Sequence, residues 1–174
     1  MNHFEFYNIA PSFLVNETAL KRTFYINSKK YHPDFYTLES AEKQAEILAL
    51  STQNNQAYKI LNDFDKRMKY LLELKQVLGQ EGENKLPQDF LMEIMELNEI
   101  MLELEFDADT EKYEEAQQAL KQQEQRLYEP VANIIENYDD NTATLEDLEK
   151  VKLFYLKKRY LLRIQENLSK FAPH

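Results

Sequence analysis

The chain has 174 residues, no cysteine, only two glycines and a formal net charge of −10. The lack of cysteine excludes disulfides, thiolate nucleophiles and thiolate metal sites, and the net negative charge makes nucleic acid a poor partner for the whole chain. Two glycines leave little room for the turns of a sheet protein, whereas apolar residues recur at spacings of three and four along most of the sequence, so we predict an all-α fold.

The charges divide the chain into two parts. Residues 1–75 hold ten basic and nine acidic side chains, whereas residues 76–174 hold eleven basic and twenty-two acidic ones. Segment 76–85 contains both glycines, Gly79 and Gly82, and glycines of this kind mark loops and linkers. We therefore expect a near-neutral module over residues 1–75, a linker over 76–85 and an acidic module over 86–174.

Several classes of function find no support in the sequence. No run is long and apolar enough to cross a bilayer, and no secretory or transit segment precedes Phe4, so we expect a cytoplasmic protein without a membrane partner. His3, His32 and His174 lie on separate segments, and there is no glycine-rich phosphate loop. We expect no metal, no cofactor and no enzymatic activity.

The first module is organised around the tripeptide His32-Pro33-Asp34. Pro33 ends the preceding helix, because proline disfavours helical geometry in the residue before it. That helix, predicted from about Glu17, has an apolar face with Leu20, Phe24 and Tyr31 and an opposite cationic face with Lys21, Arg22 and Lys29. His32 and Asp34 are therefore expected on an exposed loop beside a cationic surface.

The rest of the first module reads as three further helices. A short one covers Phe4 to Ile9, Asn16 caps the basic helix, and Ser40 caps a long one. The long helix has a stripe formed by Ile47, Leu50, Asn54, Tyr58 and Leu61. We expect the Asn54 amide to be hydrogen-bonded internally, because it interrupts an apolar stripe. A small helix with Met68, Leu71 and Leu72 closes an antiparallel helical hairpin.

The second module reads as an antiparallel three-helix bundle. The first helix starts near Leu86-Pro87 and has the seam Phe90, Ile94, Leu97, Met101 and Leu104. After a break at residues 107–110, a second helix kinks at Pro130 and has the core face Tyr113, Ala116, Leu120, Leu127, Val131, Ile134 and Tyr138. A polar turn spans residues 137–143, and Thr144 with Asp147 forms a capping box for a third helix to about Lys170.

A second set of apolar residues lies off this seam. With Leu91 at zero and about 100° per residue, the seam falls at about 220–300°, whereas Leu91, Met92, Met95 and Leu102 fall at about 0–100°. Glu96, Glu99 and Glu103 edge this apolar strip, and the stretch from Leu86 to Glu111 holds nine acidic residues and no basic one. Methionines suit adaptable binding surfaces. The alternative is that another helix of the bundle covers the strip.

These residues resemble a known family. About the first 75 residues are similar to a J-domain, the module that docks on DnaK-type chaperones and triggers their ATP hydrolysis. The residues that carry this similarity are Phe4, Phe6, Tyr7, the basic helix, the His-Pro-Asp tripeptide and Asn54 to Leu61. The ending Arg67-Met68-Lys69-Tyr70-Leu71-Leu72 resembles the HscB family, the co-chaperones of iron–sulfur cluster assembly. Two further stretches share that resemblance, Phe90-Leu91-Met92-Glu93 and Glu96-Leu97-Asn98-Glu99.

The resemblance implies two binding surfaces on an L-shaped molecule. For the ATPase domain of the chaperone it implies His32, Pro33, Asp34, Lys21, Arg22, Lys29 and Lys30. For an IscU-type cluster scaffold it implies Leu91, Met92, Met95, Glu96, Glu99, Glu103 and a residue of the third helix, Leu153 or Phe154. The absence of the cysteine-based zinc knuckle of many eukaryotic relatives favours a bacterial source.

The leading hypothesis is thus an adaptor that delivers an IscU-type scaffold to a DnaK/HscA-type chaperone and stimulates its ATPase, as a monomer or weak dimer. One alternative is a generic J-domain co-chaperone whose bundle serves a different client or dimerises. The other is a structural helical bundle in which the tripeptide is accidental, because three residues alone occur by chance in some chains of this length.

Overall fold

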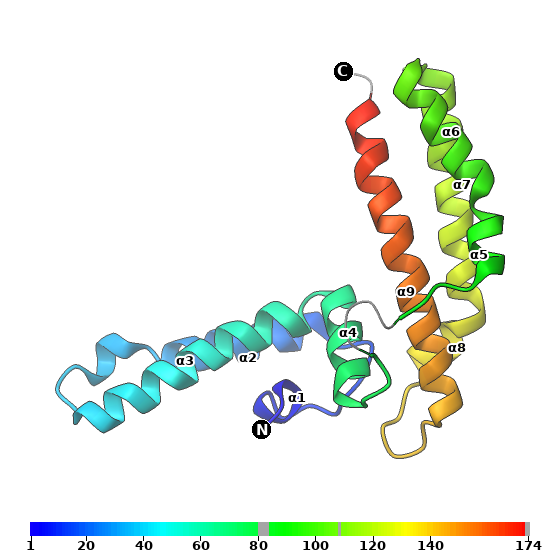
Figure 1. Cartoon of the computed structure of the whole chain (residues 1–174). Helices are drawn as coiled ribbons and strands as arrows, with labels where there is room; N and C mark the ends of the chain where they lie inside the picture. The colour runs from blue at the N-terminus through cyan, green and yellow to red at the C-terminus, as the bar shows by residue number, and fades with distance from the viewer. Residues whose placement is uncertain (80–83, 108, 173–174) are drawn as a thin grey trace. The chain divides into compact units, whose positions relative to one another are not determined.

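The computed structural model describes residues 1–79, 84–107 and 109–172 (Figure 1). These residues form helices and connecting segments, with no strand among them, which confirms the predicted all-α class. They divide into two compact units: unit 1 is Met1–Lys75 with Tyr138–Ala143, and unit 2 is Gln76–Asn137 with Thr144–His174. Residues 80–83 of the predicted linker, Gly82 among them, lie outside the described residues, as does Ala108 of the predicted break at 107–110.

Unit 1 is built on a pair of helices, α2 (Glu17–Lys30) and α3 (Ala41–Leu61), joined through the 3₁₀ turn η1 (Pro33–Tyr36). Figure 1 shows α2 and α3 running side by side from this turn. Both predicted caps are present: the Asn16 side chain accepts a hydrogen bond from the Ala19 amide at 2.9 Å, and the Ser40 hydroxyl accepts one from the Lys43 amide at 3.3 Å. The helices therefore begin where the sequence predicts.

Two short helices complete the core of unit 1. They are α1 (His3–Phe6) and α4 (Phe64–Leu74), and the fully buried side chains they contribute are Phe4, Met68, Leu71 and Leu72. Helix α1 ends earlier than the predicted Ile9, because Asn8 has a left-handed backbone with φ of 53°, which a helix cannot continue through.

Asn54 is the buried polar centre of the hairpin, as predicted. The Tyr7 hydroxyl donates to its side-chain oxygen at 2.8 Å, and its amide nitrogen donates to the Phe24 carbonyl at 3.2 Å and to the Ser28 hydroxyl at 3.1 Å. Because all these groups are buried or half-buried, each bond stabilises the packing of the loop after α1, α2 and α3 on one another.

Arg67 is a second buried polar residue, and its burial is not among the predictions from the sequence. Its side chain is 2% exposed, Nε donates to the Phe13 carbonyl at 2.8 Å, and Nη1 donates to the Leu61 carbonyl. Burial lowers the pKa of the guanidinium, although arginine keeps its charge in proteins. The guanidinium thereby ties the segment before α2 to the end of α3.

Loop Tyr138–Ala143 belongs to unit 1 although it lies between two helices of unit 2 in the sequence. The Tyr138 ring meets the Phe13 ring edge-on with centroids 4.8 Å apart, its hydroxyl donates to Asp140 at 2.8 Å, and Asp140 pairs with Lys75. Burial raises the pKa of Tyr138. The prediction that Tyr138 lies in the bundle core is therefore wrong.

Unit 2 packs α5 (Gln88–Glu93), α6 (Met95–Phe106), α7 (Thr110–Tyr128) and α9 (Leu145–Leu168) around one core. The seam residues Phe90, Ile94, Leu97 and Leu104 are buried in it, and Met101 packs against it half-buried. The single helix predicted to start near Leu86-Pro87 is split at Ile94, yet the Ile94 amide still donates to the Phe90 carbonyl and the Asn98 amide to the Ile94 carbonyl. The helical phase is therefore preserved across the split.

Pro130 interrupts the second long helix, as predicted. It lies in the 3₁₀ turn η2 (Glu129–Val131), which is followed by α8 (Ala132–Glu136). A 3₁₀ turn has about 3.0 residues per turn instead of 3.6, so the regular phase of α7 does not continue into α8. Ile135 is fully buried, whereas the predicted core residue Ile134 is only half-buried. Helix α9 starts with the predicted capping box of Thr144 and Asp147 and ends in the turn η3 (Ser169–Phe171).

We predict that Arg67→Met destabilises unit 1 by about 2–4 kcal/mol, because two buried carbonyl groups lose a charged donor. Urea denaturation followed by circular dichroism measures this change. The matched control is Lys69→Met on the same helix, whose ion pair with Glu73 is half-exposed and whose loss should cost less than about 0.5 kcal/mol. Equal effects of the two substitutions would contradict a structural role for the buried guanidinium.

We also predict an acid-dependent contribution from Asp140. Burial opposes its ionised form, but hydrogen bonds from Lys75 and Tyr138 outweigh burial and hold the pKa of Asp140 below its usual value. A carboxyl with a lowered folded-state pKa stabilises the fold above its unfolded pKa of about 3.9, and this stabilisation is lost as the pH falls through the folded pKa.

The free energy of unfolding of Asp140→Asn should therefore lie below that of the original chain at pH 7, and the gap should narrow between about pH 5 and pH 2. Glu39→Gln, an exposed carboxylate of the same unit, is the control and should show no such gap. A gap for Asp140→Asn that is independent of pH would contradict the assigned charge interaction.

Candidate partner-binding sites

The His-Pro-Asp loop is held in shape by its own residues. His32 is extended, with φ of −73° and ψ of 122°, as expected before a proline. Its Nδ1 accepts a hydrogen bond from the Asp34 amide at 3.3 Å, so the neutral imidazole carries its proton on Nε2. The side chains of His32 and Asp34 are 51% and 83% exposed. The loop thus presents an Nε2–H donor and a carboxylate to a partner.

The four predicted cations of α2 are all exposed. They are Lys21, Arg22, Lys29 and Lys30, and within the described part of the chain none of them forms an ion pair. Their charge is therefore available to a second molecule. Figure 1 shows that α2 leads directly into the His-Pro-Asp turn, so these cations and the loop lie along one element of unit 1.

Two exposed apolar residues lie among these cations and are not part of the predicted surface. Tyr25 is 60% exposed and Ile26 is 58% exposed. Tyr25 is four residues from both Lys21 and Lys29, and residues four apart share a helix face. The same spacing relates Ile26 to Arg22 and Lys30. This spacing was the signal in the sequence that would have revealed a mixed apolar and cationic surface.

The strip of unit 2 is open. Leu91, Met92, Met95 and Leu102 are 39%, 63%, 56% and 57% exposed, so no helix in the described part of unit 2 covers them, and the helical geometry predicted their position correctly. Phe106, four residues beyond Leu102, is 91% exposed and extends the strip to the end of α6. Phe106 is not among the predicted residues of the strip, although its spacing of four from Leu102 indicates the same face.

The carboxylates beside the strip are exposed as well. Glu96 and Glu99 form no ion pair among the described residues, whereas Glu103 pairs with Lys112 of α7 at 2.6 Å. Lys112 follows directly after the stretch that has no basic residue. It neutralises the Glu103 carboxylate, whereas the sequence predicted no basic partner near these carboxylates. A ligand for this surface must offer apolar groups and positive charge.

The two candidates on α9 differ in exposure. Phe154 is 6% exposed and packs edge-on against Tyr128 with ring centroids 5.8 Å apart. Leu153 is half-buried, and both residues line a groove of about 170 Å³ together with Leu127, Pro130 and Lys157. Only Leu153 of the two has substantial surface that a second protein can contact.

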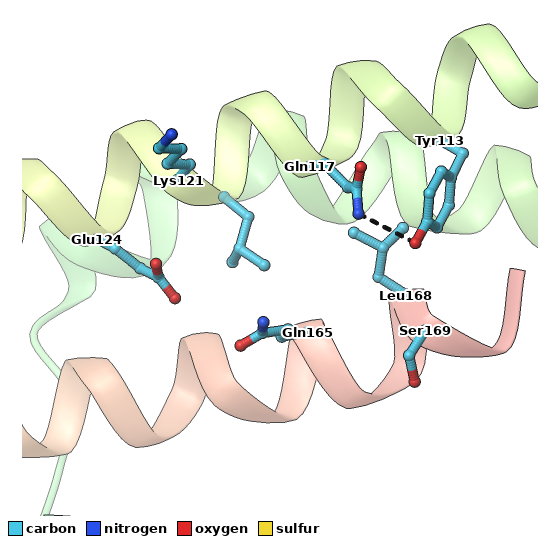
Figure 2. A pocket seen from close by; sticks show the side chains of 8 residues that line it. Tyr113, Gln117, Lys121, Glu124, Gln165, Leu168 and Ser169 are labelled. Carbon is cyan, nitrogen blue, oxygen red and sulfur yellow. Dashed lines mark hydrogen bonds between the residues drawn. The ribbon is translucent and has the colours of Figure 1, made fainter. Parts of the chain in front are cut away.

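A larger groove lies between α7 and α9, with a volume of about 480 Å³ (Figure 2). Leu120 and Leu168 line it and are buried, and Tyr113 accepts a hydrogen bond from Gln117 Nε2 at 3.0 Å. The hydroxyl of Ser169 donates to the Glu166 carbonyl at 2.6 Å. Among the lining residues, Ser169 is the residue with an aliphatic hydroxyl, and that hydroxyl is engaged with the backbone of its own helix end.

Within the described residues, no group of three His, Asp or Glu side chains is arranged to hold a metal ion, and no helix is long and apolar enough to span a bilayer. His3 stacks on Tyr70 with ring centroids 4.5 Å apart, and burial lowers the pKa of His3. His32 lies in the exposed loop, and His174 lies outside the described residues. The histidines therefore have no shared site in this part of the chain.

Comparison with known proteins links both units to one family. A family model described as the HSCB C-terminal oligomerisation domain matches residues 86–169. A co-chaperone protein HscB homolog of Vibrio atlanticus is 31% identical, with 97% of this chain and 95% of the relative covered. The iron–sulfur cluster co-chaperone protein HscB of Mus musculus is 32% identical, with 97% and 68% covered.

Solved structures agree in fold. The crystal structure of human co-chaperone protein HscB superposes with a TM-score of 0.77 at 26% identity, covering 97% of this chain and 81% of the human one. Chaperone HscB from Vibrio cholerae superposes with a TM-score of 0.64 at 24% identity, covering 97% and 99%. The likeness extends over both units.

Proposed function

Because this chain belongs to the HscB family of co-chaperones, we propose that it delivers an IscU-type iron–sulfur scaffold to a DnaK/HscA-type chaperone and stimulates the ATPase of that chaperone. The observation that carries the proposal is the presence of two exposed surfaces of opposite charge on separate units. One is the cationic α2 with the His-Pro-Asp loop, and the other is the acidic apolar strip of α5 and α6. We place this activity in the bacterial cytoplasm.

The chaperone-binding role of unit 1 is supported by the chemistry of its surface. Asp34 offers a carboxylate to a partner arginine, and His32 offers a hydrogen-bond donor beside it. The α2 cations steer an acidic partner into position, since complementary charge raises the association rate and orients the encounter. Tyr25 and Ile26 add apolar area that remains effective when salt screens the charges.

The scaffold-binding role of unit 2 is supported by the exposed strip. A run of exposed large apolar side chains on a monomeric surface usually marks an interaction site, and the methionines at 92 and 95 adapt to a partner's shape. We assign the third-helix contact to Leu153 rather than Phe154, because the Phe154 ring is engaged with Tyr128 inside unit 2. Glu96 and Glu99 then pair with basic groups of the scaffold.

Neither surface contains an activated nucleophile or a metal site, and relatives of this chain are named co-chaperones. We therefore propose that the chain acts on a partner ATPase and has no catalytic activity of its own. The matched family model is named for oligomerisation, and we add self-association of the C-terminal unit to the proposal.

We predict that His32→Gln removes at least about 90% of the ATPase stimulation, because the loop loses the donor that meets the partner. Steady-state ATP hydrolysis by the chaperone, titrated with the variant, measures this loss. Circular dichroism should be unchanged, since the His32 side chain is half-exposed and lies outside the core.

Lys59→Glu, which changes an exposed cation of α3, should keep the ATPase stimulation, whereas Lys21→Glu should weaken the stimulation most at low salt. Undiminished stimulation by His32→Gln would overturn the chaperone assignment.

We predict that alanine at Leu91, Met92 and Met95 together weakens scaffold binding by at least about a hundredfold, because three apolar contacts of roughly 1 kcal/mol each are lost. Isothermal titration of the variant with the scaffold measures this change. Stimulation of the chaperone in the absence of scaffold should remain, since these residues lie in unit 2.

The matched control replaces Leu48 and Leu145 with alanine, two residues that are exposed but lie outside the strip. This control should bind the scaffold normally and keep the same unfolding midpoint. A strip variant that unfolds would show that the three residues belong to the core. A folded strip variant that binds the scaffold normally would show that the scaffold site lies elsewhere on the chain. If the original chain stimulates the chaperone but binds no scaffold, its client is a different protein.

A further inference from the structure

Two large apolar side chains lie in the loop that carries the His-Pro-Asp tripeptide. Phe35 is 68% exposed and Leu38 is 101% exposed, so neither side chain contributes to the core of unit 1. A single exposed apolar residue is ordinary on a protein surface, whereas apolar side chains that lie together mark an interaction site. The question is therefore whether these two residues form one surface, and what covers it.

The backbone places the two side chains on the same side of the loop. The 3₁₀ turn η1 ends at Tyr36, and Thr37 keeps a helical backbone with φ of −63° and ψ of −23°. The Glu39 amide donates to the Tyr36 carbonyl at 3.1 Å, which continues the spacing of three residues. Side chains three residues apart eclipse one another in this geometry, so Phe35 and Leu38 lie together. We call these two residues the apolar tip.

Hydrogen bonds fix the loop to both helices of the hairpin. The Tyr36 hydroxyl donates to the Lys30 carbonyl at the end of α2 at 2.8 Å. Gln44 Nε2 of α3 donates to the Thr37 carbonyl at 3.2 Å and to the Glu39 carbonyl at 2.9 Å. A partner thus meets an apolar tip whose backbone is already ordered, which reduces the conformational entropy lost on association.

The apolar tip adjoins the groups that the tripeptide presents. The centroids of the Phe35 and His32 rings are 5.5 Å apart, with an interplanar angle of 52°. Asp34 directly precedes Phe35, and its side chain is 83% exposed. Any protein that contacts the His32 imidazole and the Asp34 carboxylate together therefore comes within contact distance of the Phe35 ring.

We propose that Phe35 and Leu38 determine which chaperone this chain recognises, by packing on an apolar surface of the ATPase domain beside the group that pairs with Asp34. This inference rests on the proposed function, because it adds a further part to the same contact. The charged groups orient the encounter, whereas the apolar tip contributes affinity through the apolar area that leaves water. A chaperone with charged side chains at the matching place would bury those charges without partners, so the chain would stimulate it weakly.

A lipid surface is the other class of partner for exposed apolar side chains near cations. The carboxylates around the apolar tip disfavour it: Asp34, Glu39 and Glu42 are all exposed, and anionic headgroups repel them. A protein surface with an apolar area and a basic rim suits both the tip and these carboxylates. The charge around the loop thus favours a protein partner.

The test combines Phe35→Ser with Leu38→Ser and measures the chain concentration that gives half-maximal ATPase stimulation, at about 0.05 M and about 0.5 M salt. This concentration should rise at least about tenfold at both salt concentrations, because two apolar contacts are lost and salt does not screen them. Lys21→Glu should instead lose most of its effect at high salt. Leu38→Ser alone should give at least about a threefold rise, and it leaves the ring contact between Phe35 and His32 in place.

Selectivity is measured by titrating each protein against an HscA-type and a DnaK-type chaperone. The ratio of the two half-maximal concentrations should move toward one in the double variant, because the discriminating contact is lost. Isothermal titration with the preferred chaperone at several temperatures should give a less negative heat-capacity change of binding for the variant, since less apolar surface is buried. An unchanged ratio would overturn the role of the apolar tip in chaperone choice.

The matched control is Leu48→Ser with Leu145→Ser, which makes the same change at two exposed leucines outside the loop and should leave stimulation intact. Normal stimulation by the double variant of the tip, an effect confined to low salt, or an equal effect of the control would overturn the inference and leave the proposed function standing. An original chain that stimulates neither chaperone would overturn the proposed function, and the inference with it. Vesicles of equal parts phosphatidylcholine and phosphatidylglycerol should not bind the chain; binding that the double variant loses, with normal stimulation, would assign the tip to a membrane instead.

Discussion

The hydrogen bonds of the Asn54 amide hold unit 1 together at the point where three segments meet. They join the loop after α1 through Tyr7, α2 through the Phe24 carbonyl and the Ser28 hydroxyl, and α3 through Asn54 itself. A shift of α2 along α3 would leave several buried polar groups without hydrogen-bond partners. The free energy lost in this way is larger than the free energy that a new apolar contact could contribute. One alignment of the hairpin is therefore strongly favoured, and with it the position of the His-Pro-Asp turn at its end. The Arg67 guanidinium acts in the same way at the other end, where it joins the Phe13 and Leu61 carbonyls.

The fixed core matters because only a few exposed groups form each candidate binding surface. These groups differ in charge between the two units. The α2 surface presents cations around Tyr25 and Ile26, whereas the α5–α6 surface presents carboxylates around Leu91 and Met92. Exposed charges contribute modestly to affinity but strongly to the rate and orientation of association. The apolar residues within each surface contribute the affinity that charge alone does not provide. Each unit thus carries one mixed surface, and the opposite signs disfavour exchange of the two partners.

Local sequence signals determined much of this architecture. The caps Asn16, Ser40 and Thr144 marked three helix starts, because a side-chain oxygen satisfies free amides in the first turn whatever the rest of the chain does. The seam from Phe90 to Leu104 and the strip beside it followed from the helical period alone, since position around a helix depends only on residue number. The same period indicated the positions of Tyr25, Ile26 and Phe106, because each lies four residues from a predicted member of the same surface. The division of the charges between residues 1–75 and 76–174 likewise needed no coordinates.

Long-range packing decided what these local signals left open. Ile135, and not the predicted Ile134, is fully buried, because the regular phase of α7 does not continue through the 3₁₀ turn at Pro130. Tyr138 packs against Phe13 instead of the bundle core, and Arg67 donates to the Phe13 carbonyl; the sequence did not predict either contact, because Phe13 lies far from both residues along the chain. Phe154 turned inward against Tyr128 while its neighbour Leu153 kept exposed surface, a choice that depends on the rotation of α9 against α7. Sequence by itself thus determined the helices, their caps and the polarity of each face; only the tertiary structure decided which residue of two neighbours is buried, since burial depends on what the rest of the chain places beside it.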